Sequence, residues 1–268
     1  ADGSITTYAR VNEPISVAIG PDRTVYVVDR LGAAAYAVRR IADDGTMSTL
    51  TQTAPYDAAT GAIDGSSGVA TAYTLSLAVA PSGVIYATDG AKVRKIAPDG
   101  SFSTLAGGGC EAGAAPGATC SGGRYPVDGL GTQARFMGPG EIVIDNAGNL
   151  YVSDVTLIRK ITPAGEVTTL AGRTNWIFDF LDDIDGTGNA AFFAGNSPMA
   201  IDAVGNLYKL GSRGQLRKIS PSGVVTTVAS SLGFTGARPQ NGIVSIHAGT
   251  PGVVLLQSYA QLIKVRVD

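Results

Sequence analysis

Apolar and polar residues alternate in short runs along most of the chain, and tight-turn residues separate the runs. The stretch Val17–Asp29, "VAIGPDRTVYVVD", holds one apolar run, a turn marked by Gly and Pro, and a second run with an early Tyr. The same pattern returns at Leu77–Asp89, Ile142–Asp154 and Met199–Gly211. Because a strand turns every second side chain to the same side, each stretch predicts a β-hairpin, whose strands we name A and B.

A second pattern follows each of these hairpins. It is clearest in Ile158–Gly172, "IRKITPAGEVTTLAG", and it returns at Val38–Gln52, Val93–Gly107 and Leu216–Ser230. This stretch predicts two further strands, C and D. A unit of four strands that recurs at intervals of tens of residues is typical of a β-propeller, in which each unit forms one blade.

The two ends of the chain each hold part of a fifth copy. One part begins at Val244 and stops after strand C, while Asp2–Ala9, "DGSITTYA", matches the strand D stretch Asp99–Ala106. We expect Ile5 and Tyr8 to pair with the strand around Ile263 to Val265, which would remove an exposed sheet edge. The prediction is an all-β fold: one domain, residues 1–268, forming a β-propeller of five four-stranded blades (six as the alternative) closed by pairing of its N- and C-terminal strands.

The motif Gly148–Asp154, "GNLYVSD", followed by Ile158-Arg159-Lys160-Ile161, resembles the NHL-repeat propellers, particularly their bacterial extracellular branch. The resemblance covers the blades and none of the long connections between them. It implies a toroid that recognises proteins, RNA or other ligands, with a minority of related enzymes.

Charge and hydropathy narrow the range of partners. Only 16% of the residues are charged and the formal net charge is −2, so no basic field favours nucleic acid or anionic lipid. No apolar run approaches the roughly 18 residues that a membrane helix requires, so we expect no membrane insertion. We expect a monomer or a part of a larger chain.

The only two cysteines, Cys110 and Cys120, lie in a stretch rich in Gly and Ala without a nearby His. A structural zinc site needs four nitrogen or sulfur ligands, so a disulfide is the favoured interpretation and two free thiols are the alternative. A disulfide indicates an oxidising compartment, which makes the protein secreted, periplasmic or exposed at the cell surface.

Three blades repeat an acidic residue at the end of strand B and an arginine in strand C. The fifth blade lacks both, which suggests that the two side chains form a charge-assisted bond within each blade. The expected structural pairs are Asp29 with Arg39, Asp89 with Arg94, and Asp154 with Arg159.

The connections from strand D to the next strand A are long, and we expect residues 53–74, 108–139 and 173–198 to wall a ligand site on one face. Three of them share an Asp-Gly start and an aromatic end, which we interpret as a turn and a plug between blades. The segment Asn175–Asn189 holds the sole Trp together with several Phe and Asp residues, a composition that suits a glycan or a peptide. The candidate ligand contacts are Trp176, Phe178, Asp179, Asp182 and Asp183, with Tyr56, Arg124 and Tyr125 from the other two connections.

Cofactor chemistry has little support in the sequence. Asp183, Asp185 and Gly186 faintly resemble the start of a calcium loop, but Ala194 stands where an EF-hand places its Glu, so we expect no cofactor and keep calcium as a minor alternative. His247, the only histidine, aligns with Asp145 and Asp202 at the tight-turn end of strand A, away from the long connections.

The favoured function is therefore an extracellular, non-catalytic module that binds a glycan, peptide or protein on the long-connection face. The first alternative is a lyase or hydrolase that uses carboxylates of these connections. The second is a structural tip or spacer domain of a larger surface protein.

Overall fold

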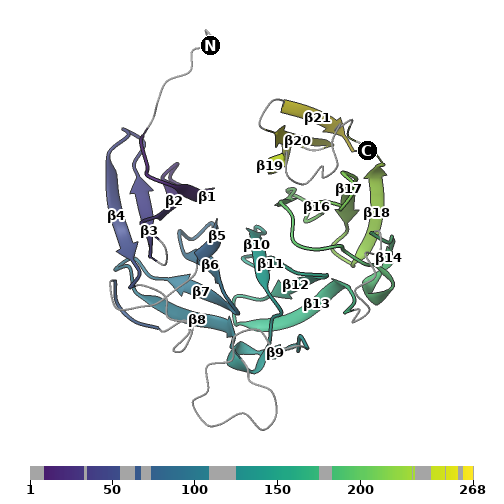
Figure 1. The fold of residues 1–268 in the computed structure, drawn as a ribbon, viewed down its shortest axis with the longest axis horizontal. Helices are drawn as coiled ribbons and strands as arrows, with labels where there is room; N and C mark the ends of the chain where they lie inside the picture. Colours follow the sequence, from purple (N-terminus) through teal and green to yellow (C-terminus); the bar gives the residue numbers. More distant parts are fainter. Residues whose placement is uncertain are drawn as a thin grey trace.

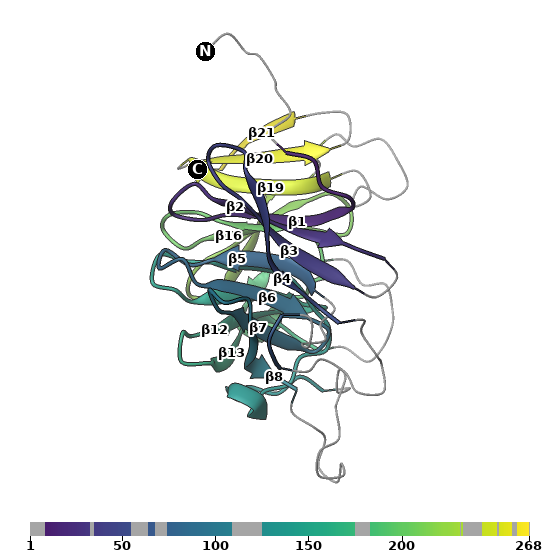
Figure 2. The ribbon, with the colours of Figure 1, turned by 90° about the vertical axis from the view of Figure 1, so that its left-hand side faces the viewer.

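Five antiparallel sheets follow one another around a common centre, each with its first strand innermost (Figure 1). The computed structural model describes residues 9–32, 35–54, 64–67, 74–108, 125–174, 183–230, 232, 243–250, 252–258 and 262–267. The predicted all-β, five-bladed propeller is confirmed. Seen from the side, turns lie along both sides of the molecule, because an antiparallel meander places its A–B and C–D turns at one end and its B–C turns at the other (Figure 2).

Each blade is a meander of strands that runs outward from the centre in the order A to D. Blades 1 and 2 are β1(Pro14–Ile19), β2(Val25–Arg30), β3(Tyr36–Ile41), β4(Met47–Gln52), and β5(Thr74–Val79), β6(Ile85–Asp89), β7(Lys92–Ile96), β8(Phe102–Gly107). Blades 3 and 4 are β10(Pro139–Ile144), β11(Leu150–Asp154), β12(Leu157–Ile161), β13(Glu166–Gly172), and β15(Met199–Ile201), β16(Leu207–Leu210), β17(Leu216–Ile219), β18(Val224–Ala229). Blade 5 is β19(Ile243–Thr250), β20(Val253–Ser258) and β21(Leu262–Arg266).

The blades are held together by one repeated packing arrangement. The face of each blade that carries the strand B tyrosine packs against the aliphatic face of the next blade. Between blades 2 and 3, for example, Tyr86 and Val93 share a cluster with Ile142 and Leu150. The tyrosines of blades 1, 3 and 4 lie in the corresponding clusters; they are Tyr26, Tyr151 and Tyr208.

The described ends of the long connections run along the outer edge of the blades. The two-residue strand β9(Gly129–Leu130) pairs with β13, and β14(Gly186–Thr187) pairs with β18. In blade 2, Gly65 forms a single bridge to Phe102 of β8. The short 3-10 helices η1(Gly131–Gln133) and η2(Gly188–Ala190) follow β9 and β14. These segments cover the free edge of strand D, so the expectation that they wall a site around the channel is wrong for them.

In blades 2, 3 and 4 a buried arginine joins the connection to its blade. The Arg159 guanidinium lies 3.0 Å from Asp154 Oδ2 at the end of β11 and 2.8 Å from Asp128 Oδ1 in the connection. Phe136, which ends the Asp-Gly motif, lies beside the same guanidinium, 5.1 Å from ring centre to Cζ. Arg94 has the same arrangement with Asp89 and Asp64, at 2.7 Å each.

Blade 1 holds a more open version of this pair. Arg39 Nε lies 2.9 Å from Asp29 Oδ2, and about a quarter of the arginine side chain (24%) remains exposed. Burial alone would raise the pKa of Asp29, but hydrogen bonds from the Glu13 and Asn12 amides and from Arg39 lower it overall. The structure thus brings together all three of the expected aspartate–arginine pairs.

The tight turns between strands A and B are built from their own side chains. Asp145 accepts hydrogen bonds from the backbone amides of Ala147 and Asn149 and from the Tyr151 hydroxyl. Burial, together with this carboxylate, raises the pKa of Tyr151 to about 12. Asp202 and Tyr208 repeat the arrangement in blade 4, so these turns serve the fold.

Two sequence predictions fall on residues that the structure does not describe. Cys110 and Cys120 lie in 109–124, and the strand expected to complete blade 5 lies in residues 1–8. Both stay predictions. Within the described residues, β21 is the last strand of the fifth sheet.

Replacing the buried arginine should destabilise the fold far more than replacing the open one. We expect Arg159→Leu to lower the free energy of unfolding by about 3–5 kcal/mol, because it leaves Asp154 buried without its counter-charge. In the matched variant Arg39→Leu, the loss should be nearer ~1 kcal/mol. Both aspartates keep two backbone amide donors, but Arg39 is partly exposed and binds one carboxylate, whereas Arg159 is fully buried and binds two. Urea unfolding followed by circular dichroism measures both, and equal losses would show that burial of the pair does not govern its contribution.

Candidate functional site

The inner strands of blades 2 and 3 and the segment before β15 line a small, open polar pocket at the end of the channel where the connections enter. Its volume is about 250 Å³. Strand register places Ser76 of β5 and Glu141 of β10 at the same level of their blades, three residues into each strand. The pocket is lined by Ser76, Gly140, Glu141, Asn196, Ser197 and Pro198.

Hydrogen bonds tie the inner strands to one another at this level. The Ser16 hydroxyl of blade 1 accepts from the Leu77 amide of blade 2 at 3.1 Å. One blade further on, the Ser76 hydroxyl accepts from the Ile142 amide at 3.4 Å and donates to Glu141 Oε1 at 3.0 Å. Glu141 replaces the serine of the repeat, so blade 3 presents a carboxylate where blades 1 and 2 present a hydroxyl.

Asn196 fixes the wall of the pocket that blade 4 supplies. Its side chain accepts from the Val155 amide and donates to the Gly138 carbonyl, both at 2.9 Å. A Cβ atom on Gly140 would lie 2.9 Å from the Asn196 amide carbon, closer than non-bonded atoms approach. Glycine at position 140 therefore allows blade 4 to sit directly against β10.

Lys209 of β16 is fully buried beside this pocket. Its ammonium group donates to the Ser197 hydroxyl at 2.6 Å, and Ser197 in turn donates to the Leu210 carbonyl at 2.6 Å. Burial lowers the pKa of Lys209 to about 8, although the carboxylates of Asp183 and Glu141 oppose this shift. Burial also raises the pKa of Glu141, against the Ser76 hydrogen bond and the charge of Lys209.

Glu141 and Lys209 are the functional candidates that sequence reasoning missed. Both break the repeat on an inner part of a blade: Glu141 stands at a serine position, and register places Lys209 level with Val152 of blade 3 and Ala87 of blade 2. A charged residue at an apolar position of an internal repeat was the available signal. With the Glu141 carboxylate and two serine oxygens in its lining, and the buried Lys209 ammonium bonded to one of those serines, the pocket can bind a polar ligand through hydrogen bonds.

Asp183, a predicted ligand contact, is instead used inside blade 4. Gly211 occupies the position where the other blades end strand B with Asp, and Asp183 brings the missing carboxylate from the connection. Its Oδ1 lies 3.2 Å from Arg217 Nη1, and its Oδ2 accepts from the amide and hydroxyl of Ser212. Asp185 binds the other arm of Arg217 at 2.7 Å, so both carboxylates of the calcium-like motif are engaged by one arginine.

The remaining predicted contacts do not meet in the described structure. Tyr125 is exposed in the segment that leads to β9 at the outer edge. The others lie outside the described residues; they are Tyr56, Arg124, Trp176, Phe178, Asp179 and Asp182.

His247 lies inside β19 and not at its end. It pairs with Leu255, as Val143 pairs with Tyr151 in blade 3, so the expected alignment with Asp145 was two positions off. The cause is an irregularity in the β19–β20 register between His247 and Thr250, which lengthens the strand. Its side chain is exposed.

Comparison with known proteins supports the fold. No protein family profile matches the chain, and no curated protein matches its sequence. A Bacteroides thetaiotaomicron protein of unknown function superposes with a TM-score of 0.59 at 18% identity, over 92% of this chain and 57% of its own. Virginiamycin B lyase from Staphylococcus aureus, a catalytically inactive form with quinupristin, gives 0.54 at 15% identity, over 100% of this chain and 75% of its own.

A third similar structure is the extracellular domain of a hybrid two-component system from B. thetaiotaomicron, with a TM-score of 0.54 at 11% identity. It is matched over 96% of this chain and 28% of its own. These neighbours are β-propeller proteins, and they include both an enzyme and an extracellular domain. The chain spans little more than half of the first of them. Among the described residues, no helix has the length and hydropathy to cross a membrane.

A double-mutant cycle tests the role of Asp183. Gly211→Asp alone should destabilise blade 4, because its Cβ would lie 2.8 Å from Asp183 Oδ2 and add a like charge. Asp183→Ala alone should cost about 3 kcal/mol by removing a counter-charge of Arg217. Combined, the two changes recreate the arrangement of blade 3, so we expect a favourable coupling of about 1–3 kcal/mol in urea unfolding. Gly211→Asn with Asp183→Ala is the uncharged control, and additive losses would show that Asp183 does not substitute for the strand B carboxylate.

Proposed function

We propose that this chain is a non-catalytic recognition module that binds a glycan or a peptide at the channel end where the connections enter. The observation that carries the proposal is the pocket between β5, β10 and the segment before β15, which Glu141 lines and beside which Lys209 lies buried, both of them departures from the repeat. A repeat maintained for packing alone gives no reason to place a carboxylate and a buried ammonium group beside one channel.

The chemistry of the pocket favours a neutral, hydrogen-bonding ligand. Glu141 and Lys209 carry opposite charges, so neither an anion nor a cation gains strongly from their combined field. The Ser76 and Ser197 hydroxyls already donate their hydrogen bonds to Glu141 and to the Leu210 carbonyl, so the pocket offers a ligand mainly acceptor oxygens, above all those of the Glu141 carboxylate. Sugar hydroxyls and peptide N–H groups are donors that suit such acceptors.

The connection that holds Trp176 leads along the chain to Asn196 and Ser197 of the pocket. We therefore keep Trp176, Phe178, Asp179 and Asp182 in the proposed site as its aromatic and acidic part. Aromatic side chains provide a large contact area for a small loss of conformational entropy, which makes Trp176 the anchor of the proposal.

The structure argues against part of the alternative function, a lyase or hydrolase that uses carboxylates of the connections. The described carboxylates of the connections that it would use are bound to buried arginines, and Asp64, Asp128, Asp183 and Asp185 all have this role. A purely structural spacer domain would not explain why Glu141 and Lys209 replace the residue types of the repeat.

Ligand binding can be tested with the fluorescence of Trp176, the only tryptophan. A panel of glycans and peptides is titrated against that signal, and Trp176→Ala should weaken a true ligand by about 2 kcal/mol or more, measured by calorimetry. Glu141→Gln should weaken it by roughly 1–2 kcal/mol, because the charged acceptor is lost. Glu166→Gln, an exposed glutamate on β13, is the matched control and should change nothing. A ligand whose affinity ignores both Glu141 and Trp176 binds elsewhere, and the proposed site is then wrong.

We also propose that the module works outside the cytoplasm, as a secreted, periplasmic or cell-surface domain. This rests on the predicted Cys110–Cys120 disulfide, which closes a short loop and would contribute about 2–3 kcal/mol on the chain-entropy model. Intact mass measured after alkylation of the native protein without reductant should show no modification. Two alkylated thiols would overturn both the disulfide and the compartment.

A further inference from the structure

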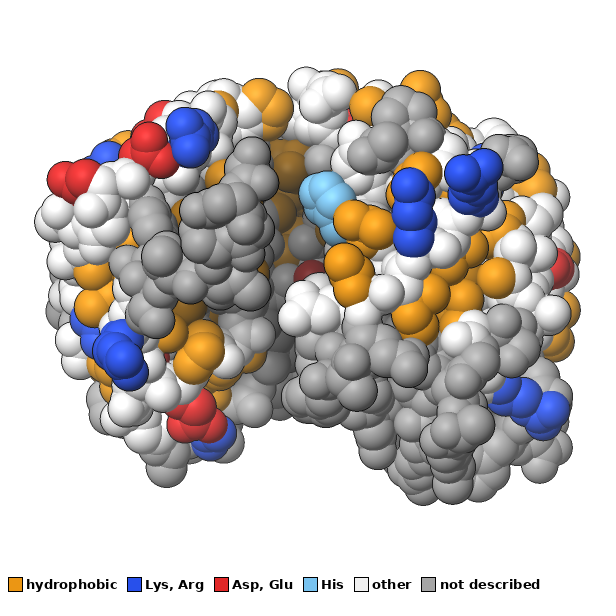
Figure 3. Space-filling model, turned by 90° about the horizontal axis from the view of Figure 1, so that it is seen from above, with side chains coloured by type: hydrophobic (Ala, Val, Ile, Leu, Met, Phe, Trp, Pro, Cys, Tyr) orange, Lys and Arg blue, Asp and Glu red, His pale blue; other side chains and the backbone are white. Residues whose placement is uncertain are grey.

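The five blades leave one side of the ring open. The inner strands pack side by side in the order β1, β5, β10, β15 and β19. Within the described residues, no hydrogen bond and no hydrophobic cluster joins blade 5 back to blade 1. Viewed from that side, the molecule is deeply hollowed between two flanks, with hydrophobic side chains deep in the hollow and on the flank that carries the histidine (Figure 3).

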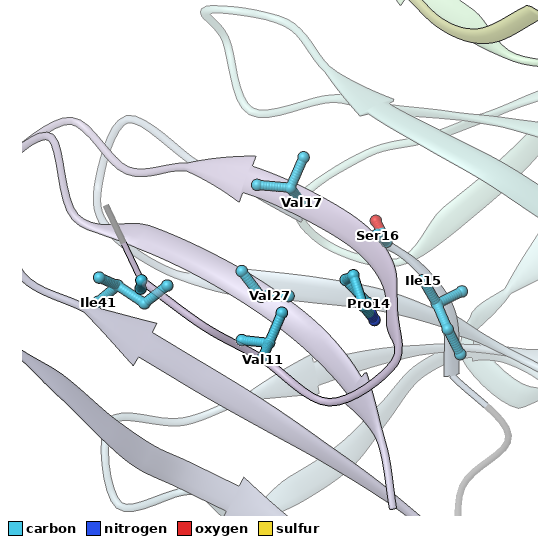
Figure 4. A pocket seen from close by; sticks show the side chains of 8 residues that line it. Val11, Pro14, Ile15, Ser16, Val17, Val27 and Ile41 are labelled. Carbon is cyan, nitrogen blue, oxygen red and sulfur yellow. The ribbon is translucent and has the colours of Figure 1, made fainter. Parts of the chain in front are cut away.

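The wall formed by blade 1 is apolar and exposed. Val17 and Ile19 of β1 are 64% and 68% exposed, whereas Leu77 and Ile142, which stand level with Val17 in blades 2 and 3, are 4% and 2% exposed. The same wall contains a groove of about 460 Å³ (Figure 4). The groove is lined by Ala9, Val11, Pro14, Ile15, Ser16, Val17, Val27 and Ile41.

The wall formed by blade 5 also exposes a side chain that is buried in the other blades. Leu262 of β21 is 70% exposed, while the residues level with it in strand C of blades 1 to 4 are buried. Leu255 stands at the position of the strand B tyrosine, and His247 is exposed on the same side of the sheet. The buried equivalents of Leu262 are Val38, Val93, Ile158 and Leu216.

These two walls are the two halves of the interface that the protein already uses four times. Blade 1 offers the aliphatic face that elsewhere receives the tyrosine-bearing side of a preceding blade. Blade 5 offers the side that elsewhere covers the aliphatic face of a following blade. An occupant that fits both walls must carry both faces, as every blade in this chain does.

We propose that the hollow between blades 1 and 5 is a docking site for one further four-stranded antiparallel sheet of this repeat type, supplied from outside these 268 residues. Its aliphatic face would cover Leu255 and Leu262, and its tyrosine-bearing face would cover Val17, Val27 and Ile41. The proposal is independent of the polar pocket between blades 2, 3 and 4.

Two other occupants fit less well. The four packed interfaces set the rotation from one blade to the next, and at that rotation blade 5 stops short of blade 1 (Figure 1). Closure of the ring on itself would require these close-packed interfaces to change together. A second copy of this chain has one exposed blade 1 wall and one exposed blade 5 wall. Because the chain forms a strongly curved arc, placing one of these walls against the first copy turns the other away. Two copies could therefore not cover each other's walls completely.

The test uses a synthetic peptide of residues 125–172, which contains blade 3 and its outer-edge segment, with a fluorescent label. We expect it to bind the full chain in an anisotropy titration and to gain β-structure by circular dichroism. Val17→Asp and Leu262→Asp should each weaken binding at least tenfold, because each places a charge on one wall. Val204→Asp, at an exposed valine in a turn of blade 4, is the matched control and should leave the affinity unchanged. A peptide with Val143→Asp and Tyr151→Asp should not bind.

A second measurement identifies the competing occupants. In a background of Cys110→Ser and Cys120→Ser, the changes Val17→Cys and Ser245→Cys place thiols on opposite walls. The equivalent pair in blades 1 and 2, Ser16 and Leu77, is joined by a hydrogen bond of 3.1 Å. Free thiols, with the Val17→Cys thiol protected from maleimide by the peptide, support the proposal. An oxidised bond within one chain shows a self-closed ring, a bond between chains shows a second copy, and either overturns it. Failure of the peptide to bind at 100 µM also overturns it.

Discussion

A buried guanidinium group is the constraint on which blades 2, 3 and 4 depend. An arginine is always charged and presents five donors in one plane, so it can be buried only where several acceptors meet it. One carboxylate comes from the end of strand B, a second from the connection, and an aromatic ring lies beside the group. In blades 3 and 4, the Asp-Gly start and the aromatic end of the connection, Phe136 and Phe193, are therefore explained by the arginine that they surround. In blade 2, the ring beside Arg94 is Phe102 of β8.

The need of each buried arginine for carboxylate partners also determines which parts of the molecule can bind a ligand. A connection that must bring an aspartate and a phenylalanine to the blade passes the outer edge, and most of its described part packs there. Only its last residues reach the pocket, as Asn196, Ser197 and Pro198 do. Blade 4 shows how strict the requirement is, because the loss of the strand B carboxylate at Gly211 is met by Asp183. The polar groups that do not bind these arginines lie on the inner strands or directly before them, as Glu141 and Ser197 do.

The hairpins and the blade repeat could be predicted from the sequence because strand alternation and turn residues are local signals. The aspartate–arginine pairs were predictable because blade 5 lacks both members together. The role of Asp183 was not, since aligning the repeats cannot show a carboxylate arriving from a connection. His247 was misplaced because a register irregularity in β19 has no signature in the alignment. The similarity of residues 2–9 to a strand D likewise carries no information on the rotation between blades.

The open side and the polar pocket lie in different parts of the same channel wall. The pocket is shared by blades 2, 3 and 4, whereas the exposed walls belong to blades 1 and 5. A sheet docked between those walls would add its own inner strand beside β1 and β19 and would complete the channel without covering Ser76, Glu141 or Ser197. Assembly and ligand recognition can therefore coexist, because each uses a separate departure from the same repeat.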